Sequence, residues 1–306
     1  MDKNQFFEDV LVTVREHIPE ELRGIVKVVV SEVLKNNDEK LHGIMMSIEG
    51  SNMMPTLYLE DFYEIYKDGE SIEEIARMII DISTTAFKNP PPIADFSFDY
   101  DNVKDKLILE LLDIDMNKER LETLVHKEVG NGFVVVPYIT IEEIFGSAMR
   151  TAITKDIAEN HDYDIDKLMD VAFLNTMGRY TPVFMAANKP YDISKFSDVL
   201  NPMSENFRID TGRNLYMLTN AEVHYGATVF FYPGIAERIG DILGKNYYVL
   251  PSSVHEMMIV PDGMGASVRD LKRLVREANA SVVESTELLS NKVFYYNRKK
   301  NCLITV

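Results

Sequence analysis

Residues 247–256 read YYVLPSSVHE, and the class of fold and of function both depend on how this stretch is interpreted. The run YYVL is aromatic and branched, which is typical of a β-strand, and Pro251 ends it. After the proline, Ser253 and Glu256 have the S-x-x-E spacing of a capping box, which predicts a helical turn. A second strand over 254–260 is the alternative. Both interpretations make the stretch a strand followed by a structural turn.

The same stretch holds the residue types of a hydrolase or transferase. Ser252 or Ser253 would be the nucleophile, His255 the base and Glu256 the acid that orients it. However, side chains adjacent in sequence point in different directions, and no G-x-S-x-G elbow is present, so the structural turn is favoured. A zinc protease is excluded, because H-E-x-x-H requires a histidine where Ile259 stands.

Strands and helices alternate along the chain without the regular rhythm of βαβ units. The C-terminal residues 292–306 predict a β-hairpin with its turn in NRKKN. Apolar residues over 141–153 recur at helical spacing behind a capping box of Thr140 and Glu143, which favours a helix, although AMRTAIT also alternates like a strand. The choice between helix and strand at 141–157 stays open. We expect an α+β fold, with mixed or antiparallel sheets packed with amphipathic helices.

The clearest sequence signal for a break between structural units is NPPP at residues 89–92. Consecutive prolines continue neither a helix nor a central strand, and they favour an extended linker. We therefore expect a small acidic α+β unit over 1–88, a proline-rich linker over 89–98 and a larger α+β domain over 99–306.

The chain is acidic, with a net charge of −17 over 306 residues. Residues 1–125 carry 13 Lys and Arg against 27 Asp and Glu, so most of the negative charge lies in the N-terminal part. Such a chain repels phosphate backbones, which makes direct nucleic-acid binding unlikely. An acidic inhibitor that mimics nucleic acid would also have this charge, and it is one of the hypotheses below.

The compartment and the cofactors are predicted from what the sequence does not contain. Cys302 is the single cysteine, so no internal disulfide framework forms, as expected in a reducing compartment. The first residues lack the apolar core of a signal peptide, and no apolar run is long enough for a membrane span. The histidines have no metal-ligand spacing, and complete phosphate-loop motifs are absent. These features predict a cytoplasmic protein without metal or cofactor.

A basic helix is predicted over 268–279, where Ser267 and Asp270 form its cap. Four cations share one face of this helix, at positions i, i+3, i+4 and i+7. Such a face suits a phosphate-bearing ligand or an acidic partner, although a solvated face that pairs with the acidic N-terminal unit is the commoner explanation. The four cations are Arg269, Lys272, Arg273 and Arg276.

An aromatic cluster is predicted in LYLEDFYEIYKDG at residues 57–69. Tyr58, Tyr63 and Tyr66 lie close together in this segment, and tyrosines in such clusters bind planar ligands or protein partners. Core packing is the favoured interpretation of the cluster.

Three segments resemble an uncharacterised family of anaerobic Firmicutes that is known only as a domain of unknown function. They are TLYLEDFYEIYKDGESIEEIA at 56–76, NYYVLPSSVHEMMIVPD at 246–262 and ELLSNKVFYYN at 287–297. A weaker similarity extends to a second uncharacterised family with a YtpQ-like layout. The resemblance implies a cytoplasmic bacterial protein and gives no activity. Its recurring positions are Tyr58, Tyr63, Tyr66, Gly69, Pro251, Ser252, Ser253, His255, Glu256, Leu289 and Ser290.

Three functions follow from the sequence. The preferred one is a non-enzymatic cytoplasmic protein that binds another protein or a small molecule, because no complete catalytic motif is present and the two ends of the chain differ in charge. The alternative is a hydrolase or transferase that uses Ser252 or Ser253 with His255 and Glu256. The second alternative is the nucleic-acid mimic, which needs acidic groups spaced like duplex phosphates.

Overall fold

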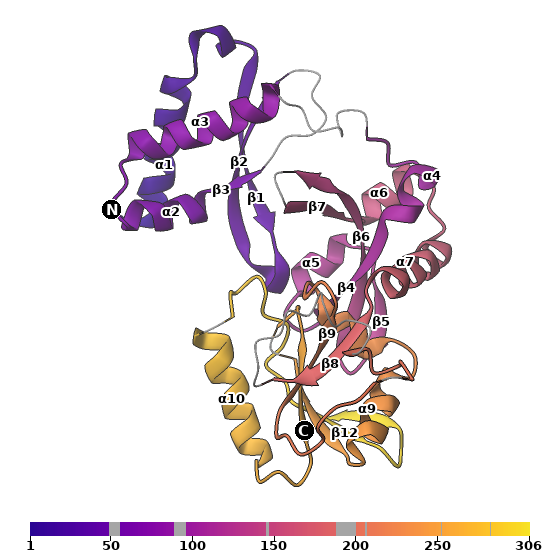
Figure 1. Ribbon diagram of the computed structural model, residues 1–306. Helices are drawn as coiled ribbons and strands as arrows, with labels where there is room; N and C mark the ends of the chain where they lie inside the picture. Colours follow the sequence, from indigo (N-terminus) through magenta and orange to yellow (C-terminus); the bar gives the residue numbers. More distant parts are fainter. Residues whose placement is uncertain are drawn as a thin grey trace. The chain divides into compact units, whose positions relative to one another are not determined.

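The chain folds into two compact units, which are described separately (Figure 1). The first consists of Met1–Lys35 and Glu39–Ser97, and the second of Asn36–Asp38 and Phe98–Val306. Both combine helices with antiparallel sheets, so the predicted α+β class is confirmed. This computed structural model describes residues 1–48, 56–88, 96–144, 147–187, 200–205, 207–251, 253–281 and 283–306.

The first unit packs three helices on a three-stranded antiparallel sheet. The sheet has the order β1 (Val26–Leu34), β2 (Lys40–Ile48) and β3 (Leu57–Tyr58). The helices are α1 (Lys3–His17), α2 (Leu59–Lys67) and α3 (Ile72–Lys88). Their apolar faces meet over the sheet in one core, whose fully buried members include Phe6, Val10, Ile44, Leu59, Ile75 and Ile79.

The turn between β1 and β2 belongs to the second unit. There the Asp38 carboxylate accepts hydrogen bonds from the backbone N–H groups of Glu119 and Arg120, at 2.9 and 2.8 Å. These N–H groups lie in the first turn of α5 (Lys118–Thr123), where backbone donors have no acceptor within the helix. The N-cap residue of α5 supplies no side-chain acceptor for them. A residue from a distant part of the sequence therefore caps this helix.

The second unit has two antiparallel sheets. In the first, β6 (Phe133–Ile144) lies between β4 (Leu107–Asp113) and β5 (Lys127–Gly130), and also pairs with β7 (Ser147–Ala152). Every residue of β4 is buried. The helices around it are α4 (Tyr100–Val103), α6 (Lys155–Asn160) and α7 (Ile165–Arg179), and α7 packs on β4. A 3₁₀ turn over Lys104–Lys106 leads into the sheet.

The second sheet of this unit contains the stretch YYVL as its strand β10 (Tyr247–Leu250), as predicted. The strand order is β13 (Cys302–Thr305), β12 (Phe294–Asn297), β10, β11 (Met257–Pro261), β9 (Tyr216–Asn220) and β8 (Pro182–Ala186). The C-terminal hairpin is confirmed as β12–β13. A 3₁₀ helix over Gly226–Phe231 and the helices α9 (Ile235–Leu243) and α10 (Val268–Ser281) also belong to this unit.

The helix favoured over 141–153 is wrong. Strand β6 continues to Ile144, turns back, and pairs with β7 in a register that joins Ile141 to Met149 and Tyr138 to Ala152. The chain had already entered a strand at Phe133, and one edge of that strand pairs with β4 along seven residues. Extending the hairpin satisfies the backbone groups of the other edge, and this outweighs the helical spacing of the apolar residues.

Candidate functional site

Two of the three segments that carry the family resemblance lie side by side in the second unit. The Ser290 N–H donates to the Pro251 carbonyl at 2.9 Å, and the Val254 N–H donates to the Glu287 carbonyl at 2.8 Å. Between them, Ser253 and Leu288 form an isolated β-bridge. The stretch at 251–256 therefore holds in place the segment that joins α10 to β12.

The capping box expected at Ser253 and Glu256 does not start a helix. Ser253 is 5% exposed, and its Oγ accepts a hydrogen bond from the His255 N–H at 3.0 Å, two residues on. The bridge to Leu288 keeps the backbone extended, and β11 begins at Met257. The tertiary pairing thus replaces the helical turn. Ser252 lies outside the described residues.

His255 uses both of its ring nitrogens. Its Nδ1 accepts from the Tyr225 N–H at 3.1 Å, so the neutral ring has its proton on Nε2, which lies 3.2 Å from Oε1 of Glu287. A base that activates a serine needs a free ring nitrogen at hydrogen-bond distance from the hydroxyl. The structure instead brings His255 to Glu287, and it directs the Ser253 hydroxyl to the main chain of His255 and the carboxylate of Glu256.

A largely buried polar cluster extends from His255 toward the first sheet. At its centre, Arg150 of β7 forms an ion pair with Glu110 of β4. The same guanidinium donates to Nε2 of His224 at 3.0 Å and lies 3.7 Å from the centre of the Tyr225 ring. His224 in turn stacks on His255, with 5.3 Å between ring centres. Five separate segments of the chain supply the side chains of this polar cluster, which are Glu110, Arg150, His224 with Tyr225, His255 and Glu287.

Burial raises the pKa of two carboxyl groups, Glu110 and Glu256. It raises the pKa of Glu110, which is 4% exposed, and the attraction of Arg150 opposes this rise. Burial also raises the pKa of Glu256, against the opposing effects of His255 and a hydrogen bond from Ser253. Perturbed pKa values are common at functional sites, and they also occur in structural ion-pair networks. Here the polar groups are directed at one another, which is the arrangement of a structural network.

The backbone around His224 is strained. Val223 and Tyr225 have φ angles of 53° and 52°, in the left-handed region that a β-branched residue rarely adopts. The Asn220 side chain holds the turn between them, because its Oδ1 accepts from the His224 N–H and its Nδ2 donates to the His224 carbonyl. No sequence motif predicts this part of the cluster, since no motif spacing links residues that are so far apart along the chain.

We predict that His224 stays neutral well below the usual range of histidine. Its ring packs on His255 and Arg150 although the residue as a whole is exposed; desolvation lowers its pKa to about 4, and the positive charge of Arg150 adds to the effect. Because this pKa is below the unfolded value of about 6.5, the stability it contributes is complete above that value and is lost as pH falls toward 4.

Proton NMR of the His224 ring will show the titration midpoint directly. The variant His224→Gln serves as the control, since its unfolding free energy should lack this part of the pH dependence. A wild-type midpoint near 6.5 would contradict the prediction.

The second candidate for a functional site, after the polar cluster, is an open groove of about 530 Å³ along α10. All four cations predicted to share a helix face line it, together with Val268 and Glu277. The helix starts as predicted, because Ser267 Oγ accepts the Asp270 N–H at 3.2 Å. Leu271 and Val275 face the core, which directs the opposite face of α10 to solvent.

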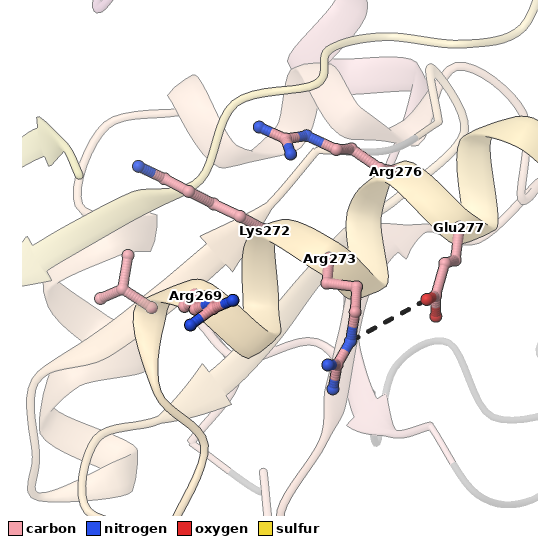
Figure 2. Close-up of a pocket in the computed structure, with 6 residues that line it drawn as sticks. Arg269, Lys272, Arg273, Arg276 and Glu277 are labelled. Carbon is pink, nitrogen blue, oxygen red and sulfur yellow. Dashed lines mark ion pairs between the residues drawn. The ribbon is translucent and has the colours of Figure 1, made fainter.

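The four cations differ in their partners. Arg273 pairs with Asp270 at 3.2 Å and with Glu277 at 3.9 Å. In the part of the chain that the structure describes, no ion pair is formed by Arg269, Lys272 or Arg276. Figure 2 shows Lys272 and Arg276 extended toward the same side of the helix, whereas Arg273 points away from them beside Glu277.

The three tyrosines of the predicted aromatic cluster lie in the first unit. Tyr63 and Tyr66 pack on the buried ring of Phe6, with ring centres 5.2 and 5.0 Å from it. The Tyr63 hydroxyl donates to the Met1 carbonyl, and Lys35 covers the Tyr58 ring at 4.5 Å. The rings of Tyr63 and Tyr66 therefore pack between α1 and α2, and the ring of Tyr58 contacts Lys35.

Within the described ranges, no group of three or more His, Cys, Asp or Glu residues is placed to hold a metal ion. In the same ranges, no helix has the length and hydropathy needed to cross a membrane.

Comparison with known proteins gives a match to a family profile. No curated protein and no solved structure matches the chain. The sequence profile of a Family of unknown function (DUF5688) matches residues 3–298, which include most of both units, the polar cluster and the α10 groove. This confirms the expected membership of a family without a known activity: the chain belongs to the DUF5688 family.

Proposed function

We propose that this chain is a non-enzymatic cytoplasmic binding protein, which holds an anionic group of its ligand or partner in the α10 groove. The observation that carries the proposal is the set of three cations, Arg269, Lys272 and Arg276, that line one groove without ion pairs in the described chain. On a chain with a net charge of −17, acidic side chains to pair with them are plentiful. Their unpaired state leaves them available to an external anion.

The size of the groove also supports binding of a ligand. Small-molecule sites typically have volumes of about 300–1,000 Å³, and the groove has about 530 Å³. Its cations stand on a rigid helix whose cap and apolar face are both satisfied within the second unit. A site on such an element needs little reorganisation when the ligand arrives, which favours affinity.

The test is anion binding by the full chain, measured by calorimetry with sulfate, citrate, pyrophosphate and a hexaglutamate peptide. We expect the wild type to bind the multiply charged anions, and the affinity to fall as NaCl is raised from about 0.1 M to about 0.5 M. The variant Arg269→Gln/Lys272→Gln/Arg276→Gln should bind none of them. Glutamine keeps helix propensity close to that of lysine and arginine, so α10 should stay folded.

Two results would reject the proposal. One is a wild type that binds none of the four anions. The other is a triple variant that binds them as well as the wild type does while its circular dichroism shows an intact fold, because the anion would then bind elsewhere.

A further inference from the structure

Three cations of α10 that form no ion pair with any described residue lie one after another along the helix. Arg269, Lys272 and Arg276 stand at i, i+3 and i+7, which places them within an arc of about 60° and over about 10 Å of the helix axis. Arg269 and Arg276 are exposed, and Lys272 is half-buried beside them. In Figure 2, the side chains of Lys272 and Arg276 run side by side from adjacent turns. The backbone positions of these three residues therefore follow one another along a narrow strip of the helix surface.

The length of this strip limits the size of the anion. A single phosphate group is a compact charge. It cannot contact Arg269, Lys272 and Arg276 together unless their side chains change direction. A long polyanion reaches them, but it also extends over the rest of a protein of net charge −17. Its segments more than one Debye length, about 8–10 Å, from the groove gain no attraction from the three cations, and the net charge of the chain they lie on is negative. The strip suits an anion of intermediate length.

The side-chain types of these three cations favour binding of phosphoryl groups. Two of the three cations are arginines, whose planar guanidinium groups bind phosphate oxygens in pairs, and the third is a lysine, which binds phosphate as a point charge. Each phosphoryl group offers several strong acceptor oxygens and a terminal one has nearly two negative charges, so a short chain of them carries more charge per length than carboxylates do.

We infer that the α10 groove binds a linear chain of two or three phosphoryl groups, either free or as part of a nucleotide. The inference rests on the proposed function and specifies its ligand class. Arg269 and Arg276 would hold the two ends of the chain, and Lys272 would neutralise its middle. Arg273 is outside this set, because Asp270 and Glu277 already balance its charge.

Calorimetry with orthophosphate, pyrophosphate and tripolyphosphate, using the full chain, tests the inference. Affinity should rise about tenfold or more from orthophosphate to tripolyphosphate, as successive charge-assisted contacts are added. Arg276→Gln should weaken tripolyphosphate binding about tenfold. Arg77→Gln, which removes an exposed arginine of α3 outside the groove, is the matched control and should change it less than about twofold.

Three further anions distinguish the sources and the competing ligands. Adenosine triphosphate that binds like tripolyphosphate supports recognition of the phosphate chain alone, and tighter binding supports a nucleotide as its source. Equal affinity along the phosphate series, equal affinity for citrate, or tighter binding of a single-stranded oligonucleotide would overturn the inference. Each of these results leaves anion binding at α10 intact, whereas a protein that binds no anion would remove both proposals.

Discussion

Arg150→Ala is expected to lower the free energy of unfolding by about 3–5 kcal/mol, because it leaves the Glu110 carboxylate buried without its counter-charge. The side chains of Arg150 and Glu110 are only 12% and 6% exposed, so water screens the pair weakly. The same substitution removes the donor to His224 and the cation over the Tyr225 ring. One side chain thus joins β4, β7 and the loop before the 3₁₀ helix at 226–231.

The measurement is urea unfolding of the full chain, followed by near-ultraviolet circular dichroism of its 15 tyrosines, since it has no tryptophan. Arg273→Ala is the matched control, because it removes an arginine whose ion pairs are exposed and screened, and its effect should be much smaller. The pair Glu110→Met/Arg150→Met should recover most of the lost stability, since it removes both charges and keeps the volume. An Arg150→Ala variant as stable as Arg273→Ala would contradict the structural role of the cluster.

Sequence patterns were sufficient wherever the determinants are local. The strand YYVL, the C-terminal hairpin and the cap of α10 at Ser267 each depend on residues a few positions apart, and each is confirmed. Helical spacing also placed the four cations of α10 on one groove. Local patterns failed where a distant partner competes with them. Ser253 has the spacing of a capping box, but its bridge to Leu288 keeps the chain extended.

The polar cluster could not be found in the sequence for the same reason. Glu110, Arg150 and His224 are far apart in the chain, and each is ordinary within its own segment. Glu110 is the single charged residue inside the apolar run LILELL, which is a weak signal that it has a buried partner, but the run does not show which one. Only the pairing of β6 with β4 and β7 brings Arg150 to it, and the hairpin that makes this pairing was itself expected to be a helix.

A second substitution with a large expected effect on the free energy of unfolding is at Asp113 of β4, to which the segment after α10 is attached. Asp113, which is 1% exposed, accepts a hydrogen bond from the Ser290 hydroxyl at 2.6 Å and lies 3.1 Å from the Lys292 ammonium. Asp113→Ala leaves the fully buried Ser290 hydroxyl without its acceptor and removes one counter-charge of Lys292. We expect it to lower the unfolding free energy by about 2–4 kcal/mol.

Asp115→Ala is the matched control for Asp113→Ala in the same urea experiment. Asp115 also pairs with Lys292, at 2.7 Å, but its side chain is 62% exposed, so its removal should have only a small effect. Asp113→Asn should lie between the two, because it keeps an acceptor for Ser290 and loses the charge. Equal effects of Asp113→Ala and Asp115→Ala would show that the ion pair with Lys292 matters and the buried hydroxyl does not. A larger effect of Asp113→Ala means that the buried hydrogen bond from Ser290 to Asp113 attaches the segment after α10 to β4. The Ser290 carbonyl in turn accepts a hydrogen bond from Asn279 near the end of α10.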